Sequence, residues 1–516
     1  MAALTDLPAD RPTRARINER DLAVVRCEQG GPPHVLDDRC PHRGGQLSDG
    51  TVRGEDIVCP LHGYDFDLHT GVSRYDAHER VAVYPTRIVD GHVEVDADAV
   101  PPLPTGHDAG YLGPWRRPSD PGLRAYGYLR GLASGAPPVS AMGSARAVRP
   151  SWDDILLLPG QVSRPPRLDD EPLSLRTVIG RAAARPLVLD VPMFVSHMSF
   201  GALSASAKVA LARVAEETGT AIGSGEGGLL RPERAAASRY IFEMASGYFG
   251  WRPENIAHAD AVELKFGQSA KAGSGGLLPG AKVTPQIAEV RGLRPGEDAH
   301  SPARFVDLSG PAALRDRVTA IRDQIGGRPV GIKFAAGHVE DDVEAAVAAG
   351  IDFITIDGRG GGTGAAPDVL KDNLTIPLPY ALYRARWQLE HLGRPDIDVI
   401  ATGGLRSAGD VVKALALGAQ AVALATASMI AIGCQQYLAC DSGNCPVGIA
   451  TQRADLEGRF DVDLSTERGA ATFRALRAEI ELVARAVGVA DVHDLRPSDL
   501  ATLDSEIANH TDVHHA

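Results

Sequence analysis

The pattern of apolar and polar residues divides the chain into regions that differ in periodicity. Up to about residue 96 it consists of short alternating segments such as DLAVVRC, DIVCP and HVEVDA, separated by Gly, Pro and Asp turns. This pattern predicts a small antiparallel β-domain over residues 1–96. Residues 97–150 are rich in Pro and Gly and lack periodicity, which predicts a linker between domains.

From about Pro186 short apolar runs alternate with helical patterns. Runs such as AVELKF, PVGIKF, DFITIDG and DVIATGG are typical of buried parallel strands, and PLVLDVPMFVS is the first of them. The helical segments SASAKVALARVAEETG, VEDDVEAAVAAG and SAGDVVKALALG each end in a Gly suited to a left-handed helix end. Repeated βα units predict a (β/α)8 TIM barrel, with a doubly wound sheet as the alternative. Seven strands are recognisable and one is not placed.

The barrel domain is expected over residues 151–460, followed by a C-terminal helical extension over 461–516. The segment ERGAATFRALRAEIELVARAVG predicts an amphipathic helix packed on the barrel. The last residues, HTDVHHA, are expected to fray, as chain ends often do. The fold class is therefore multidomain.

Composition and charge narrow the function further. The chain has 516 residues, 44% of them hydrophobic and 23% charged, which suits two or three globular domains and argues against disorder. Its formal net charge of −13, without basic blocks, argues against nucleic acid as a partner. There is no signal peptide and no apolar run of about 18 residues, so no membrane association is expected and the cytoplasm is the expected compartment.

Two short motifs in the first domain carry cysteine and histidine. Cys40 and His42 form CxH, and sixteen residues later Cys59 and His62 form CxxH. Two thiolates on one iron and two imidazoles on the other describe a [2Fe–2S] centre of the Rieske kind. A tetrahedral zinc ion with the same four metal ligands is the alternative.

The wording of these motifs, CPHRGG and CPLHGYDFD, resembles that of the Rieske ferredoxin and oxygenase families. High-potential Rieske proteins carry two further cysteines that form a disulfide between the two loops. This sequence lacks them and resembles the low-potential, ferredoxin-like branch.

Gly-rich turns follow two of the predicted barrel strands. Gly360 to Gly364 follow DFITID, Gly403 and Gly404 follow DVIATG, and Thr426 ends AVALAT. At the C-terminal ends of barrel strands, loop amides can bind a phosphate and glycine lets the backbone approach a flat ring. Flavin mononucleotide (FMN) fits such a pocket. Plain structural turns are the alternative, because βα turns need Gly for steric reasons.

A second group of cysteines follows the last predicted strand. Cys434, Cys440 and Cys445 lie in the single segment GCQQYLACDSGNCPVG. Three thiolates without a fourth ligand suit a [3Fe–4S] cluster better than a closed zinc site, which needs four ligands.

From residue 151 to Gln452 the chain resembles the FMN-binding synthase domain of glutamate synthase. The resemblance rests on several long motifs, among them MSFGALS, GSGEGG, AVELKFGQSAKAGSGGLLPGAKV, DGRGGGTGAAP and CDSGNCPVGIATQ. It implies a (β/α)8 barrel with FMN next to a [3Fe–4S] cluster. It also implies reduction of the imine formed from 2-oxoglutarate and ammonia to glutamate.

The resemblance assigns roles to individual residues. It implies that FMN is bound by Met198, Ser199, Gly201, Lys333, Gly361, Gly362, Gly404 and Thr426. The catalytic and oxo-acid-binding residues that it implies are Lys333, Glu226, Lys271 and Arg291. Arginine is a natural bidentate partner for a carboxylate, and the Lys333 ammonium could stabilise negative charge on the reduced flavin.

The match to this family is incomplete in one loop. The family usually reads GEGGQLPG, whereas this chain reads GSGGLLPG, so Ser274 replaces a Glu and Leu277 replaces a Gln that helps to bind 2-oxoglutarate. Losing a polar contact of this kind could change the substrate specificity. No glutamine amidotransferase domain and no NAD(P)-binding fingerprint are recognisable, so ammonia or an amine and an external electron donor, a ferredoxin or a reductase, are expected as partners.

The sequence thus predicts an oxidoreductase that acts on CH–NH2 donors, with electrons entering through the Rieske cluster. One alternative is the reverse reaction, in which an amine or amino acid is oxidised and electrons leave through the Rieske centre. A non-catalytic electron-transfer module is another. A Rieske oxygenase is disfavoured, since no close histidine pair follows for a non-haem iron. A homo-oligomer is compatible with the sequence, which does not set the oligomeric state.

Overall fold

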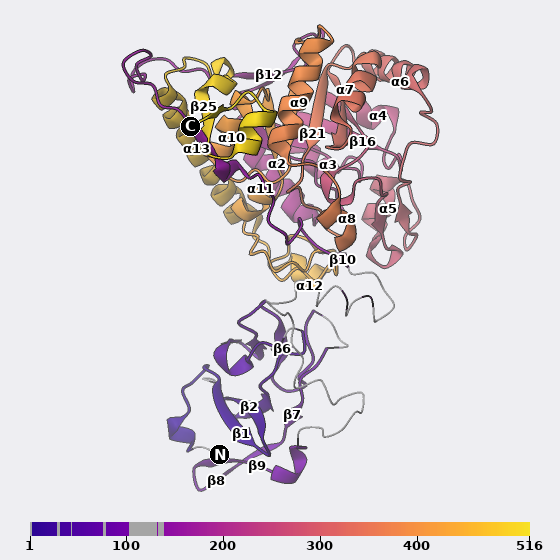
Figure 1. Cartoon of the computed structure of the whole chain (residues 1–516). Helices are drawn as coiled ribbons and strands as arrows, with labels where there is room; N and C mark the ends of the chain where they lie inside the picture. The colour runs from indigo at the N-terminus through magenta and orange to yellow at the C-terminus, as the bar shows by residue number, and fades with distance from the viewer. Residues whose placement is uncertain are drawn as a thin grey trace. The chain divides into compact units, whose positions relative to one another are not determined.

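A computed structural model describes residues 3–27, 31–42, 44–75, 79–102, 129, 132 and 139–516. The chain forms two compact units, residues 1–137 and 138–516 (Figure 1). The predicted linker over 97–150 lies largely outside the described residues and stays a prediction. Among the described residues, no helix is both long and apolar enough to cross a membrane.

The first unit is built from short antiparallel strands, as the sequence predicts. One sheet joins β1 (Thr13–Ile17), β2 (Arg20–Val25), β3 (His34–Asp37) and β7 (Val83–Tyr84). A second joins β4 (Thr51–Arg53), β5 (Asp56–Val58) and β6 (Asp65–Asp67), and β8 (Thr86–Val89) pairs with β9 (His92–Val95). Leu36, Leu47, Ile57 and Phe66 are fully buried between these strands together with Cys40 and Cys59. The core of the small domain therefore surrounds the cysteines of both motifs.

The second unit contains a closed barrel of eight parallel strands, which confirms the (β/α)8 prediction. The strands are β14 (Met193–Val195), β15 (Ile222–Gly223), β16 (Tyr240–Ala245), β17 (Ala261–Lys265), β20 (Val330–Ala335), β21 (Phe353–Asp357), β23 (Asp398–Thr402) and β24 (Ala421–Leu424). The first and last strands close the barrel through Phe194 and Ala423. The strand that the sequence left unplaced is β16, a fully buried run with one charged residue, Glu243.

One strand prediction needs a correction. The run PLVLDVPMFVS is not a single strand, because Leu187–Leu189 (β13) pairs antiparallel with Thr177–Ile179 (β12) outside the barrel. Leu187 and Leu189 pack on residues of the barrel strands such as Phe194 and Phe353. The apolar character of the first half of the run thus reflects this packing and not a place in the barrel.

Helices cover the outside of the barrel (Figure 1). They include α2 (Ala205–Glu217), α3 (Arg231–Ala235), α4 (Pro253–Ile256), α6 (Pro311–Gln324), α7 (Val339–Ala348), α9 (Leu378–His391), α10 (Ala408–Ala416) and α11 (Thr426–Ala431). The three helices predicted to end in glycine do so, at Gly219, Gly350 and Gly418, with φ of +68°, +78° and +99°. Only glycine adopts this backbone conformation without strain.

A long excursion connects β17 to β20 at the C-terminal end of the barrel. It contains η5 (Ser269–Lys271), β18 (Leu277–Leu278), η6 (Gly280–Lys282), α5 (Pro285–Arg291) and β19 (Ala299–His300). A shorter excursion after β21 carries β22 (Ala366–Pro367), which pairs with β10 (Val139–Ser140), and α8 (Asp368–Asn373). These segments bring additional side chains to one end of the barrel.

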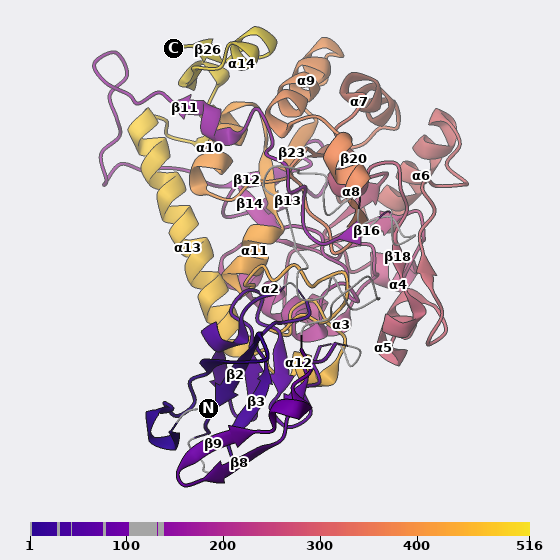
Figure 2. The ribbon, with the colours of Figure 1, turned by 60° about the horizontal axis from the view of Figure 1, so that its bottom comes forward.

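The predicted C-terminal helix is α13 (Val462–Val487), which runs along the outside of the barrel and packs on α2, α10 and α11 (Figure 2). After it, β25 (Leu500–Thr502), α14 (Ser505–His510) and β26 (His514–His515) follow, and β25 pairs with β11 (Ile155–Leu157). The prediction that the last residues fray is wrong. They pair with Ala501 and Thr502, and Val513 is buried, so packing fixes the chain end.

The contact between α13 and α2 depends on a residue without a side chain. A Cβ added to Gly469 would lie 2.5 Å from Cγ2 of Val214 and 3.1 Å from Cγ2 of Ile432. We expect Gly469→Ala to lower the free energy of unfolding by about 1–3 kcal/mol, because the added methyl overpacks two stiff side chains. The matched control is Gly409→Ala in α10, where no such clash exists, and it should not destabilise the protein. Thermal unfolding of both variants tests this, and equal melting temperatures would contradict it.

Candidate functional site

The two cysteine-histidine motifs of the first unit form loops of the same shape. In the first loop the amide of Cys40 donates to the carbonyl of Gly45 (2.8 Å), and in the second the amide of Cys59 donates to that of Tyr64 (2.7 Å). The glycine four residues after each cysteine donates back to the cysteine carbonyl, at 2.7 and 3.0 Å. Both glycines have positive φ, +71° and +72°. The repeated Cys-to-Gly spacing therefore encodes a repeated backbone turn.

The four predicted ligand side chains lie together in these loops. Cys40 and Cys59 are buried, and the hydrogen bond from Cys40 lowers the pKa of the Cys59 thiol to about 7, although burial opposes this. The rings of His42 and His62 have their centroids 5.0 Å apart. A Cβ on Gly45 would lie 2.6 Å from Sγ of Cys59, so the first loop passes directly against the sulfur of the second. Two thiols and two imidazoles in this proximity fit a two-iron cluster held by both loops.

In the second unit, the predicted catalytic residues converge at the C-terminal ends of the barrel strands. Glu226 follows β15, Lys333 lies in β20, Lys271 lies in η5, and Arg291 is the last residue of α5. All four side chains are largely buried. Residues far apart in the sequence are thus brought to one end of the barrel.

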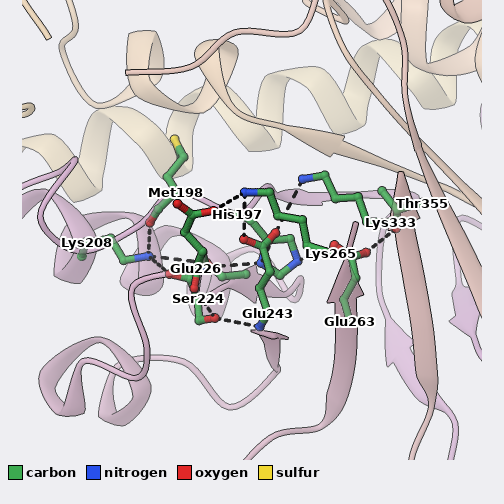
Figure 3. Close-up of polar contacts among 12 residues, drawn as sticks. His197, Met198, Lys208, Ser224, Glu226, Glu243, Glu263, Lys265, Lys333 and Thr355 are labelled. Carbon is green, nitrogen blue, oxygen red and sulfur yellow. Dashed lines mark hydrogen bonds and ion pairs between the residues drawn. The ribbon is translucent and has the colours of Figure 1, made fainter. Parts of the chain in front are cut away.

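An ion-pair network connects three of them, Glu226, Lys271 and Lys333, through Lys265 and Glu243, which the sequence did not single out. Figure 3 labels all members of the network except Lys271. Nζ of Lys265 lies 2.7 Å from Glu226 and 3.6 Å from Glu243, and Nζ of Lys333 lies 3.7 Å from Glu243. Nζ of Lys271 lies 3.8 Å from Glu226. Burial alone would raise the pKa of Glu226, but Lys265 and Lys271 hold it well below its usual range. The network therefore keeps its carboxylates ionised in a buried setting.

Arg291 enters the same region from the excursion between β17 and β20. Its Nη2 donates to the carbonyl of Phe200 (2.8 Å), and its guanidinium lies 5.0 Å from the ring centroid of Phe249. Its buried Nε has no hydrogen-bond partner among the described residues. Burial lowers the pKa of Arg291, while Glu226 opposes this shift. A buried guanidinium with donor capacity left over is suited to bind a carboxylate.

A second cluster, which sequence reasoning missed, shares Glu243 with this network. His197, which follows β14, lies between two carboxylates: its Nε2 is 3.2 Å from Glu263, and its Nδ1 is 3.7 Å from Glu243. Thr355 donates a hydrogen bond to Glu263. Burial raises the pKa of Glu263 to about 7 and lowers that of His197 to about 3. The sequence holds one signal for this cluster: the mainly apolar runs YIFEMA and AVELK each contain a glutamate, Glu243 and Glu263.

The Gly-rich turns predicted to bind a cofactor pack against one another. A Cβ on Gly404 would lie 3.2 Å from Cα of Gly360, and one on Gly362 would lie 3.5 Å from Oγ1 of Thr426. A Cβ on Gly361 would lie 2.5 Å from Oδ1 of Asp357. The loops after β21 and β23 therefore meet through backbone atoms, and the side chain of Thr426 after β24 lies against Gly362, with little room for larger side chains.

The remaining predicted cofactor residues lie in the loop after β14. The carbonyl of Met198 accepts a hydrogen bond from Nζ of Lys208 (2.6 Å), and Lys208 is in turn paired with Glu233 at 2.6 Å. The backbone amide of Ser199 lies against Gly225, where a Cβ would be 2.4 Å away. Gly201 has φ of +103° and lies near Nη2 of Arg291. This loop is thus fixed beside the ion-pair network.

The three C-terminal cysteines lie in a loop that follows α11. Burial raises the pKa of Cys440 to about 12, with contributions from Cys445 and Cys434, so the three thiols interact electrostatically. Gln436 and Leu438, between the first two cysteines, have φ of +55° and +57°. Nζ of Lys282, from the excursion between β17 and β20, donates to the carbonyl of Asp441. A tight loop with three neighbouring thiols fits a three-iron cluster.

Two family models match this chain, one in each of its two compact units. Residues 167–490 match the family model described as a conserved region in glutamate synthase, and residues 1–85 match the Rieske [2Fe–2S] domain. The chain is 37% identical to the archaeal-type glutamate synthase (NADPH) of Thermotoga neapolitana, an alignment that covers 72% of this chain and 78% of the relative. It is 35% identical to a glutamate synthase large subunit-like protein of Rhizobium meliloti, over 73% and 90%.

Among solved structures, the chain resembles a flavocytochrome b2 mutant with pyruvate bound, with a TM-score of 0.44 and 17% identity. This alignment covers 70% of the present chain and 80% of the other.

The ion-pair network makes a prediction about stability. We expect Lys265→Met to lower the free energy of unfolding by about 3–5 kcal/mol, because it leaves buried carboxylates without their nearest cation. The matched control is Arg213→Met, which removes an exposed pair with Asp463 and should cost less than about 1 kcal/mol. Urea unfolding measures both. A Lys265→Met variant as stable as the control would refute the view that the network needs this ammonium group.

Proposed function

Because the chain belongs to the glutamate synthase family and carries a Rieske [2Fe–2S] domain, we propose that it reduces the imine of a 2-oxo acid and ammonia to an amino acid. It is an oxidoreductase of the class that acts on CH–NH2 donors. The oxo acid that we propose is 2-oxoglutarate, and the electrons come from a separate donor protein and enter through the Rieske cluster.

The charge balance at the barrel mouth is the observation that carries this proposal. The cationic side chains of this region are Lys265, Lys271, Arg291 and Lys333. The carboxyl groups with lowered pKa are Glu226 and Glu243, whereas burial raises the pKa of Glu263 and of Asp357. Cations thus outnumber ionised carboxylates among the described residues of this region. An excess of buried positive charge favours a dianionic substrate such as a dicarboxylic oxo acid.

The residues present fit an FMN in the same region. The loops after β23 and β24, together with the short helix α11, occupy the position at which TIM barrels commonly bind phosphate. Gly360 and Gly404 approach each other so closely that the backbone of these turns carries no side chain there, which suits the approach of a phosphate or a flat ring. We therefore assign FMN binding to Met198, Ser199, Gly201, Lys333, Gly361, Gly362, Gly404 and Thr426. When bound, FMN takes up electrons singly and delivers hydride.

Two iron–sulfur clusters complete the proposed electron path. We assign the [2Fe–2S] cluster to Cys40, His42, Cys59 and His62, and a [3Fe–4S] cluster to Cys434, Cys440 and Cys445. The end of β24 belongs to the region that we assign to FMN. The short helix α11 follows β24, and the cysteine loop follows α11. Covalent attachment raises the effective concentration of the Rieske domain at the barrel, because this electron carrier is tethered to its acceptor.

The protein's own side chains account for binding and charge stabilisation. Arg291 and Lys271 bind the substrate carboxylates through charge-assisted hydrogen bonds. Lys333 provides positive charge where negative charge accumulates on reduction. Glu226 sets the position of both Lys265 and Lys271 by pairing with them.

One experiment tests the reaction directly. Purified protein with a chemical one-electron reductant, 2-oxoglutarate and ammonia, under exclusion of oxygen, should form glutamate, measured by mass spectrometry. Pyruvate and oxaloacetate as competing oxo acids establish specificity. Oxidation of glutamate with an electron acceptor tests the reverse direction in the same preparation. If neither direction is observed with any of the oxo acids, the proposed function is wrong.

Substitution of Arg291 tests substrate binding. We expect Arg291→Lys to raise KM for 2-oxoglutarate by about 10- to 100-fold, because a bidentate charge-assisted contact is worth about 1.5–3 kcal/mol. The control is Arg294→Lys, an exposed arginine three residues further along. Steady-state kinetics give both values. An unchanged KM in Arg291→Lys would remove this residue from the substrate site.

Two cysteine substitutions test the cluster assignments separately. We expect Cys440→Ser to abolish the electron paramagnetic resonance signal of an oxidised three-iron cluster and to leave the signal of the reduced Rieske centre intact. Cys59→Ser should do the converse, so each variant is the control of the other. Loss of both signals in either variant, or of neither, would contradict the assignment.

A further inference from the structure

The proposed reaction requires protons as well as electrons. Reduction of an imine, C=NH, to an amine, CH–NH2, consumes two electrons and two protons. Iron–sulfur clusters carry electrons without protons, so the protons must reach a buried site by another route. Titratable side chains that are connected to one another are such a route, and this inference rests on the proposed function.

His197 connects two buried carboxyl groups on neighbouring strands. Its Nε2 lies 3.2 Å from Oε1 of Glu263 on β17, and its Nδ1 lies 3.7 Å from Oε2 of Glu243 on β16. The amide of Gly225 also donates to Nδ1, at 3.3 Å. The imidazole thus has a carboxyl group at each ring nitrogen (Figure 3).

The other carboxyl oxygen of Glu243, Oε1, faces the residues that we assign to substrate binding. Oε1 of Glu243 lies 3.6 Å from Nζ of Lys265, and that ammonium group lies 2.7 Å from Glu226. Lys333 also faces Glu243, at 3.7 Å. A continuous series of titratable groups therefore runs from Glu263 through His197, Glu243 and Lys265 to Glu226.

The same three residues, His197, Glu243 and Glu263, have the donor types of a metal site, with ligand atoms within 4.8 Å of one another. Two ammonium groups already neutralise Glu243, and a metal cation would be repelled by them in a buried, low-dielectric setting. Protons suit the cluster better than a metal ion does.

We propose that Glu263 holds a reserve proton that His197 and Glu243 transfer to Lys265 during the reaction. The proton moves from Oε1 of Glu263 to Nε2 of His197, while the proton on Nδ1 passes to Oε2 of Glu243. Glu243 then restores the ammonium group of Lys265 after that group has protonated the substrate nitrogen, directly or through Glu226. The carbon receives the hydride equivalent, which is two electrons and one proton taken up from solvent, and the nitrogen receives the second proton, which is replaced by the one that Glu263 held. The electrons come from the external one-electron donor.

The contacts around His197 fit the state after this transfer. With Nε2 protonated and Glu263 ionised, Nδ1 accepts a hydrogen bond from the amide of Gly225, and Nε2 lies at ion-pair distance from Glu263 without a hydrogen bond between the two. A proton returning from the pocket through Glu243 reverses both steps. The raised pKa of Glu263, about 7, suits a group that gains and loses a proton near neutral pH.

The charged groups that surround the pair define its pH dependence. Lys333, Glu243 and Lys265 act on Glu263, and Thr355 donates a hydrogen bond to it. Glu243, Lys333, Lys208 and Lys265 act on His197. The limb of the pH profile near 7 should therefore disappear when Glu263 is replaced and remain when a carboxyl group outside this set is replaced.

The test compares Glu263→Gln with Glu233→Gln. Both glutamates are fully buried with a pKa raised to about 7 by burial, but Glu233 pairs with Lys208 and Tyr240 and not with His197. We expect Glu263→Gln to retain FMN and iron and to change KM less than twofold. Its kcat should fall about 100-fold, which is the lower end of the usual effect of losing a general acid or base. Its solvent deuterium isotope effect on kcat should change as well. Glu233→Gln should keep the isotope effect and pH profile of the parent.

A double variant separates a proton path from a structural role. Because His197 and Glu263 act in series, His197→Gln with Glu263→Gln should be no slower than either single variant, whereas independent structural effects would multiply. Multiplying effects, or a parent-like kcat and isotope effect in Glu263→Gln, would overturn the proposal.

A measurement without substrate keeps this test distinct from that of the proposed function. The infrared difference spectrum of the protein between about pH 6 and about pH 8 should show loss of protonated carboxyl bands, of which Glu263→Gln removes one component and Glu233→Gln another, because burial raises the pKa of both groups to about 7. Absence of the Glu263 component in the parent overturns the proton reserve. If that component is present but no oxo acid is converted, the reserve stands and the proposed function is wrong.

Discussion

The pairing of charges buried inside the barrel is the constraint on which the catalytic end depends. Glu243 lies on a strand with no exposed residue, and its carboxylate remains ionised because Lys265 and Lys333 on two other strands face it. An unpaired ion in that position would be strongly destabilising. The strands that supply these partners must therefore keep their register, and this requirement links the stability of the barrel to the geometry of its polar groups.

The fold could be predicted largely from the sequence, because its signals are local. Apolar runs, helix-terminal glycines and the two Cys/His motifs each occupy a few consecutive residues. The sequence pattern does not place the strand Tyr240–Ala245, and it joins the hairpin strand Leu187–Leu189 to the following barrel strand. Both errors concern apolar segments whose environment depends on packing with distant residues, which sequence periodicity does not report.

The same distinction applies to the site. Cysteines, an arginine and Gly-rich turns could be identified by residue type and by a family resemblance. The cluster of His197, Glu243 and Glu263 could not, since its members are spread over nearly seventy residues and come together only through closure of the barrel. A charged residue within a buried strand indicates a partner, but the sequence does not indicate which one. The structure supplies that pairing.

Lys282 has a consequence for how the parts of the barrel end communicate. It belongs to the excursion that also carries Leu277 and Arg291, yet its side chain holds the carbonyl of Asp441 in the cysteine loop. The ammonium group of Lys282 therefore anchors the excursion between β17 and β20 to the segment that carries the thiols. Any shift in the cysteine loop is therefore transmitted through Lys282 to the excursion that carries Arg291.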